Sequence, residues 1–257
     1  MTADKKLSLF LSQHWYSLFI LVLGLYVGLP FIAPVLMEWG WWTPAKAIYA
    51  FYATQCHQMP QRSFFFFGSN GMYSLDEIQL AGQNVDAMKV LRRFIGNPDL
   101  GWKVAWSDRM VYMYASALAA GLLWKPLRKQ LKYLPIWGFF LFLLPLALDG
   151  TSHFISDLLS GFGQGFRFDN AWLAVLTKYS LPYDFYNGDA FGSFNSIMRL
   201  ISGISFGIGG IWFVLPHVDD YVGEIIEKHQ KVNQLYHDQI RQLAAKPLAV
   251  EHNRLDE

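Results

Sequence analysis

Residues 56–63, with the sequence Cys-His-Gln-Met-Pro-Gln-Arg-Ser, form a polar segment between an apolar run and four consecutive phenylalanines. A thiol, an imidazole, two carboxamides and a guanidinium within eight residues are side chains that commonly bind ligands. Pro60 lacks a backbone donor and prevents an ordinary helix from continuing through these residues. We therefore expect a bent segment that presents several ligand-binding groups.

The composition is that of a membrane protein. Hydrophobic residues make up 53% of the 257-residue chain and charged residues only 16%, far from a soluble average. The net charge of +1 gives no basic field for nucleic acid, so no nucleic-acid partner is predicted. The single cysteine, Cys56, excludes an internal disulfide and a CxxC metal site.

The predicted fold class is all-α, a polytopic membrane helix bundle over residues 1–216. A re-entrant or interfacial half-helix is expected at residues 44–56, because its apolar part is too short to cross the hydrocarbon core of about 30 Å. Thr43-Pro44 is typical of the start of such a helix. Four apolar runs predict transmembrane helices, at residues 15–37, 108–124, 134–153 and 194–215.

The remaining segments are predicted to lie outside the bilayer. Residues 68–107, with a surface helix at 85–95, and residues 154–192 form two outer insertions. Pro216 is expected to close the last span, and residues 217–257 then form a cytoplasmic amphipathic helix and tail. Basic residues near the inner span ends place both termini in the cytoplasm of a multi-pass cell-membrane protein, namely Lys5, Lys6, Lys125, Arg128, Lys129 and Lys132.

In this topology the polar ends of three spans meet residues 56–63 at the outer face. A charge at the bilayer centre costs roughly 2.5–3.5 kcal/mol, so these groups should be paired, solvated or near the interface. Arginines outnumber aspartates, which favours binding of an anionic group such as a lipid phosphate. The candidate ligand-binding residues are Cys56, His57, Arg62, Asp108, Arg109, Asp149, His153, Asn195 and Arg199.

Other interpretations of this cluster stay open. Its arginines and aspartates could be ion pairs that tie the span ends together. Cys56, His57, Asp149 and His153 are acceptable metal ligands, although adjacent Cys and His residues rarely reach one ion. Nothing in the sequence orders these groups into a catalytic mechanism. The sequence therefore favours a non-enzymatic protein, and no cofactor is predicted.

Two features predict protein partners in addition to membrane lipid. Gly203, Gly207 and Gly210 give the last span a small face on which a helix can pack closely. In the amphipathic helix at residues 217–246, acidic residues offset the basic ones, so anionic lipid attracts it little. A second copy or another subunit is the expected partner, and the alternative function is a non-catalytic accessory subunit of a larger membrane complex.

An ordered set of motifs over about residues 45–215 resembles the DUF2085 family of predicted membrane proteins. The motifs are CHQ-x-P-x-RS from Cys56, Arg109 with Tyr114, LDG at Asp149, and N-x3-R-x3-G-x3-G from Asn195. The resemblance implies a small polytopic membrane protein of uncharacterised function. Ser107 and Met110 stand where that family commonly has cysteines, so a metal or disulfide role resting on those cysteines does not carry over.

Overall fold

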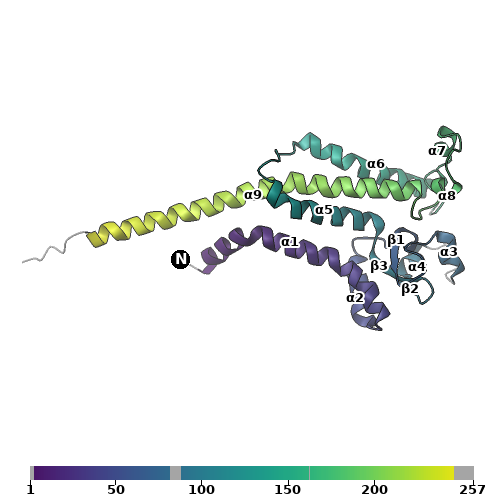
Figure 1. Cartoon of the computed structure of the whole chain (residues 1–257), viewed down its shortest axis with the longest axis horizontal. Helices are drawn as coiled ribbons and strands as arrows, with labels where there is room; N and C mark the ends of the chain where they lie inside the picture. The colour runs from purple at the N-terminus through teal and green to yellow at the C-terminus, as the bar shows by residue number, and fades with distance from the viewer. Residues whose placement is uncertain (1–2, 82–87, 162, 246–257) are drawn as a thin grey trace, which may run out of the picture. The chain divides into compact units, whose positions relative to one another are not determined.

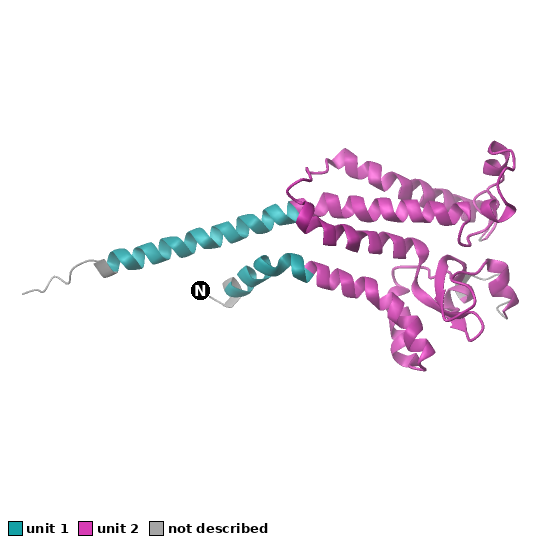
Figure 2. Cartoon of the chain, in the orientation of Figure 1, with its two compact units in different colours: residues 1–18, 217–257 teal, residues 19–216 magenta. Residues whose placement is uncertain are grey.

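The computed structural model describes residues 3–81, 88–161 and 163–245. The chain divides into two compact units (Figure 2). One contains residues 19–216. The other contains residues 1–18 and 217–257, within which the described residues are helical.

Long helices dominate the described residues, as predicted (Figure 1). Three stretches are long and apolar enough to cross a membrane, Lys6–Glu38, Ile136–Ser160 and Phe194–Leu243, counted over the described residues. They coincide with three of the four predicted spans, although the predicted span at 134–153 begins two residues before Ile136. The predicted second span also forms a helix but is not among these three. The long helices are α1 (Ala3–Glu38), α5 (Asp108–Leu127), α6 (Ile136–Ser160) and α9 (Phe194–Ala245).

Helix α2 (Trp42–Tyr52) replaces the predicted half-helix at 44–56. It begins two residues earlier than predicted and is followed by turns over residues 53–55. At about 1.5 Å per residue, its 11 residues span roughly 16 Å, so α2 is too short to cross a bilayer. Trp42 and Phe51 on this helix are exposed.

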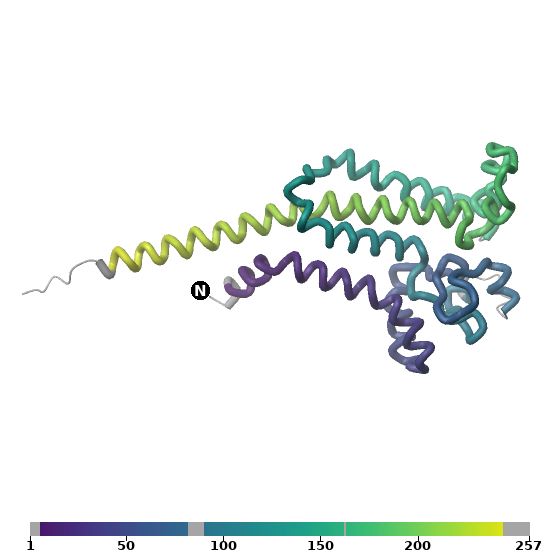
Figure 3. The backbone as a smooth tube through the Cα atoms, viewed as in Figure 1, coloured from purple at the N-terminus to yellow at the C-terminus, as the bar shows by residue number. Residues whose placement is uncertain are grey.

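One of the predicted helix ends is wrong. Pro216 lies inside α9, which is continuous from the predicted last span into the predicted amphipathic helix (Figure 3). A proline inside a helix removes one backbone donor and costs about 3 kcal/mol, yet α9 continues past it to a length of 52 residues. Gly150 lies inside α6, as it does in the predicted span at 134–153, and one glycine in a helix costs only about 1 kcal/mol relative to alanine.

A three-stranded antiparallel sheet, which was not predicted, occupies part of the first insertion. Its strand order is β1 (Ser63–Phe66), β3 (Gly101–Ser107), β2 (Gly96–Asn97). Residues 103–106 of β3 are all fully buried, so the strand shows no alternation that would mark it in the sequence. The phenylalanine run that follows the polar segment forms most of β1.

Short helices complete the two insertions. The predicted surface helix at 85–95 corresponds to α4 (Met88–Arg93), and residues 85–87 lie outside the described residues. The other short helices are η1 (Pro60–Arg62), α3 (Leu75–Leu80), α7 (Ala171–Leu176) and α8 (Tyr183–Tyr186).

An aromatic cluster joins four elements of residues 19–216. The Trp106 ring of β3 stacks on Tyr114 of α5, with ring centroids 4.8 Å apart. It also meets Tyr26 of α1 and Tyr52 of α2 edge-on, at 5.2 and 5.1 Å. The Tyr52 hydroxyl donates to the Tyr26 carbonyl at 2.7 Å. These contacts hold the end of α2, and therefore the polar segment after it, against the start of α5.

Glycines let α9 approach its neighbours closely. A Cβ added to Gly207 would lie 2.2 Å from the Met113 carbonyl oxygen of α5, and one added to Gly203 would lie 3.0 Å from the Arg109 carbonyl oxygen. Gly210 has no such neighbour within 4 Å. The predicted Gly203/Gly207 face therefore packs on α5 of the same chain and is not open to a second copy.

Candidate functional site

The polar segment is bent as predicted, and Gln58 holds the bend. Its backbone is left-handed (φ 50°), an uncommon conformation for a residue other than glycine. Its side-chain amide donates to the carbonyl oxygens of Tyr49 and Ala105, each at 2.9 Å. Gln58 thereby ties the segment to α2 on one side and to β3 on the other.

Cys56 and His57 lie in different surroundings. The Cys56 thiol is buried and donates to the Ser107 hydroxyl at 3.3 Å. Ser107 is the residue before α5, and its side chain makes no capping hydrogen bond to that helix. The His57 side chain is exposed. The two adjacent residues therefore differ in burial.

Arg199 is the centre of one ion-pair group. Its Nε lies 2.9 and 2.8 Å from the two carboxylate oxygens of Asp108. Its Nη1 lies 2.8 Å from Asp189 Oδ1, while Asp189 Oδ2 accepts from Arg62 Nε at 2.8 Å. Burial raises the pKa of Asp189, but Arg62 and Arg199 more than offset this and hold that pKa below its usual range. The group thus joins η1, α5 and α9 through charged side chains.

Asp149 is the centre of a second group. Its two carboxylate oxygens accept from Arg109 Nη2 at 2.5 Å and from Arg167 Nη2 at 2.6 Å. Because α6 continues past Gly150, His153 lies on the same helix face. The His153 Nε2 is 3.8 Å from Asp149 Oδ1 and 3.3 Å from Arg167 Nη2.

Asn195 is fully buried and has a structural role. Its amide donates to the carbonyl oxygens of Arg167, at 2.5 Å, and Gly188, at 2.9 Å. Both carbonyls belong to the second insertion, so Asn195 fastens that insertion to the start of α9.

A cavity of about 860 Å³ opens beside both ion-pair groups. Six of the nine predicted site residues line it, whereas Asp108, Asp149 and Asn195 do not. The aspartates at those positions instead hold cavity-lining arginines in place. The charged and imidazole side chains that line the cavity are His57, Arg62, Arg92, Arg109, His153, Asp157 and Arg199.

The balance of charge at the cavity is positive. Four arginines line it against a single carboxylate, Asp157, and the two ion-pair groups contain four arginines but three aspartates. Arg109 Nε is buried and has no hydrogen-bond partner among the described residues. An anionic group is therefore the ligand chemistry that fits this cavity.

The four candidate metal ligands do not converge. Cys56 bonds to Ser107, and both Asp149 oxygens are engaged by arginines. Among the described residues, no three His, Cys, Asp or Glu side chains are grouped so that they could hold a metal ion.

Sequence reasoning missed Arg167 and Asp189. Both come from the second insertion, where the surrounding Gly- and Phe-rich sequence gives no periodicity to place them. The sequence offered one signal. The predicted cluster held three arginines and two aspartates, so a further carboxylate was needed to pair every arginine. Several aspartates of that insertion would have satisfied it equally well.

Lys103 of β3 is a further buried charge that was not predicted. Its side chain is fully buried, and its Nζ donates to the carbonyl oxygens of Gln58 at 2.7 Å and Arg92 at 3.0 Å. Burial lowers the pKa of Lys103 to about 7. Lys103 therefore links the polar segment to α4 from within the sheet.

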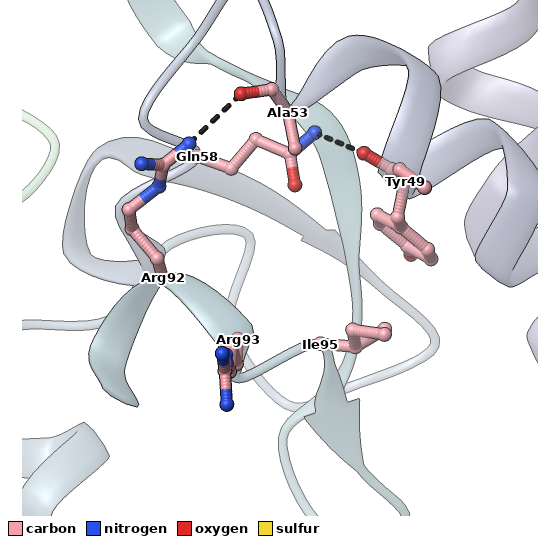
Figure 4. A pocket seen from close by; sticks show the side chains of 7 residues that line it. Tyr49, Ala53, Gln58, Arg92, Arg93 and Ile95 are labelled. Atoms are coloured by element: carbon pink, nitrogen blue, oxygen red, sulfur yellow. Dashed lines mark hydrogen bonds between the residues drawn. The ribbon is translucent and has the colours of Figure 1, made fainter. Parts of the chain in front are cut away.

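A second cavity, of about 370 Å³, lies between α2 and α4 (Figure 4). Gln58 and Arg92 line both cavities. Arg92 Nη2 donates to the Ala53 carbonyl oxygen at 2.8 Å, which spans the gap between α4 and the end of α2 (Figure 4).

No family model matches the chain, and no solved structure matches it. The chain is 30% identical over 185 residues to the uncharacterized protein MJ1492 of Methanocaldococcus jannaschii, an alignment that covers 68% of this chain and 95% of that protein. The chain therefore belongs to the same family as this archaeal protein.

Proposed function

We propose that this chain is a multi-pass protein of the cell membrane that binds an anionic group, a phosphate or a carboxylate, in the 860 Å³ cavity. The observation that carries the proposal is the excess of guanidinium groups at the cavity, with the buried Nε of Arg109 unpartnered among the described residues. The ordered motifs around these residues also support membership of the DUF2085 family.

The ion pairs favour binding because they hold the arginines in position before a ligand arrives. Asp189 and Asp108 fix Arg199, and Asp149 fixes Arg109. A ligand then does not have to order these long side chains, each of which would otherwise cost about 0.5–1.5 kcal/mol. Arginine forks also match the oxygens of phosphate or carboxylate in pairs.

The test compares Arg109→Lys with the wild-type protein in a non-ionic detergent. Lysine keeps the charge beside Asp149 but loses the Nε donor and the planar fork. Binding of inorganic phosphate, measured by calorimetry at constant ionic strength, should weaken at least about tenfold, as expected for the loss of a charged hydrogen bond of about 1.5–3 kcal/mol. Arg93→Gln is the control, since Arg93 is exposed and does not line this cavity. Phosphate binding that is absent from the wild type, or equal in Arg109→Lys, would refute the proposal.

A second proposed function is that of an accessory subunit in a larger membrane complex. It is supported by large apolar side chains along the C-terminal part of α9 that are exposed in the described chain. They fall at positions i, i+3, i+4, i+8 and i+11, which is typical of one face of a helix that docks on another helix. They are Val232, Leu235, Tyr236, Ile240 and Leu243.

A further inference from the structure

The cavity that carries the proposed function has an apolar wall as well as a charged one. Phe154 and Leu158 of α6 line it together with Met110 of α5. The first two residues are 68% and 71% exposed, although Arg199 and the three aspartates of the ion-pair groups are almost fully buried. A small hydrated anion would touch the arginines and leave this wall in contact with solvent.

Helix geometry places the apolar wall in line with the guanidinium group of Arg109. Gly150, Phe154 and Leu158 are spaced four residues apart, so they lie in a row on one face of α6. A Cβ at Gly150 would lie 3.8 Å from Arg109 Nη1. Because Gly150 has no side chain, it leaves Arg109 accessible to a ligand that lies along Phe154 and Leu158.

The same helix exposes apolar side chains along its whole length. Helix α6 is one of the three candidate membrane spans, and its outward side chains would meet acyl chains in a bilayer. Phe154 and Leu158 belong to these exposed apolar side chains and also line the cavity. The apolar group of a ligand can therefore reach the arginines from the lipid phase along this helix. The exposed large apolar side chains of α6 are Ile136, Trp137, Phe140, Leu141, Leu144, Leu148, Phe154, Ile155, Leu158 and Leu159.

We infer that the ligand of this cavity is an amphiphilic anion, an organic phosphate or carboxylate whose apolar group lies on Phe154 and Leu158 while its anionic group meets Arg109. The inference rests on the proposed function, because it names the ligand class for the same cavity. The positive charge of the arginines favours the anionic group of the ligand, and the row from Gly150 to Leu158 favours its apolar group.

The experiment compares inorganic phosphate, ethyl phosphate and hexyl phosphate as ligands of the full chain in non-ionic detergent, by calorimetry at constant ionic strength. Each buried methylene adds up to about fourfold in affinity, so hexyl phosphate should bind the wild type at least about tenfold more tightly than inorganic phosphate. The double variant Phe154→Ala/Leu158→Ala should lose about tenfold in affinity for hexyl phosphate and keep its affinity for inorganic phosphate.

A matched control separates this wall from the rest of α6. Phe140→Ala/Leu141→Ala removes the same side-chain types from exposed positions of the same helix that do not line the cavity. It should leave all three affinities unchanged. Equal affinity for the three phosphates, or equal losses in both double variants, would overturn the inference while the proposed function stands. If no phosphate binds the wild type, the proposed function fails together with the inference.

Discussion

Arg199 of α9 and Asp108 of α5 form a buried ion pair in which one guanidinium nitrogen contacts both carboxylate oxygens, at 2.9 and 2.8 Å. The two residues are 91 positions apart in the chain, and 1% and 0% of their surfaces are exposed. Asp189 accepts from the two other nitrogens of the same guanidinium. Arg199 is therefore the residue through which α5, α9 and the second insertion share one charge network.

Arg199→Ala should leave Asp108 as a buried carboxylate without its cation. Removing one partner of a buried pair costs about 3–5 kcal/mol, so the yield of monodisperse protein in size-exclusion chromatography should fall sharply. Arg93→Ala, at an exposed position, should leave the yield unchanged. A normal yield of Arg199→Ala that is accompanied by lost phosphate binding would assign Arg199 to the ligand instead of to the fold.

Gly207→Ala should destabilise the protein, whereas Gly210→Ala should not. The added Cβ at position 207 would lie 2.2 Å from the Met113 carbonyl oxygen, and overpacking of this kind typically costs 1–3 kcal/mol. At position 210 nothing lies within 4 Å, so alanine gains up to about 1 kcal/mol of helix propensity. Melting temperatures in detergent compare the two variants. Equal melting temperatures would show that α5 and α9 do not pack closely at Gly207.

The sequence predicted the elements that depend on composition and on local periodicity. The apolar runs of α1, α6 and α9 exceed the length of a span. The polar segment is bent as predicted, but its left-handed residue is Gln58, and Pro60 begins the short helix η1. Prediction failed where tertiary contacts override the local pattern. Strand β3 is buried at four successive positions, including Lys103, and therefore resembles neither an alternating strand nor an apolar span.

The site could be predicted only in part, because some of its residues are placed by tertiary contacts and not by a local pattern. Residues that stand at the ends of helices could be assigned to one level of the bundle, and the structure places Asp108, Arg109 and Arg199 together. Arg167 and Asp189 reach the site from a long insertion without periodicity, so only the folded chain places them. Cys56, a predicted ligand-binding residue, lines the cavity and also donates to the Ser107 hydroxyl.

Lys103 should make the stability of the protein depend on pH. Its pKa is lowered from 10.5 to about 7 in the folded chain, so between these values the unfolded chain binds more protons. Stability should then rise with pH across this window, by at most about 1.4 kcal/mol per pH unit. Melting temperatures of wild type and Lys103→Met from pH 7 to 10 measure the effect as the difference in slope. Parallel curves would show that Lys103 keeps an ordinary pKa.

Reporter fusions should test whether α5 crosses the membrane as a fourth span, which its helical length of 20 residues permits. With the termini in the cytoplasm, fusions after Lys129 and at the C-terminus should report the cytoplasm, and a fusion at Asn97 should report the outside. The same report from Asn97 and Lys129 would mean that α5 does not cross. A cytoplasmic report from Asn97 would also reverse the predicted orientation of the cavity.

The C-terminal part of α9 should be the element that docks on a protein partner. Val232, Leu235 and Leu243 are each 60–68% exposed, and an apolar helix face of this kind binds a second helix. Deleting residues 217–257 should leave the spans inserted and remove the chain from its native assembly, as seen by size in mild detergent after native purification.

A triple variant tests the same docking without truncation. Val232→Asn/Leu235→Asn/Leu243→Asn should release the chain from the assembly because polar side chains on the face forfeit the burial of apolar surface, about 25 cal/mol per Å². Glu227→Gln/Lys231→Gln is the control, since this exposed pair contributes little to stability or binding. If the truncated chain and the triple variant migrate with the same partners at the same size, α9 does not dock the chain, and the accessory-subunit function loses its main support.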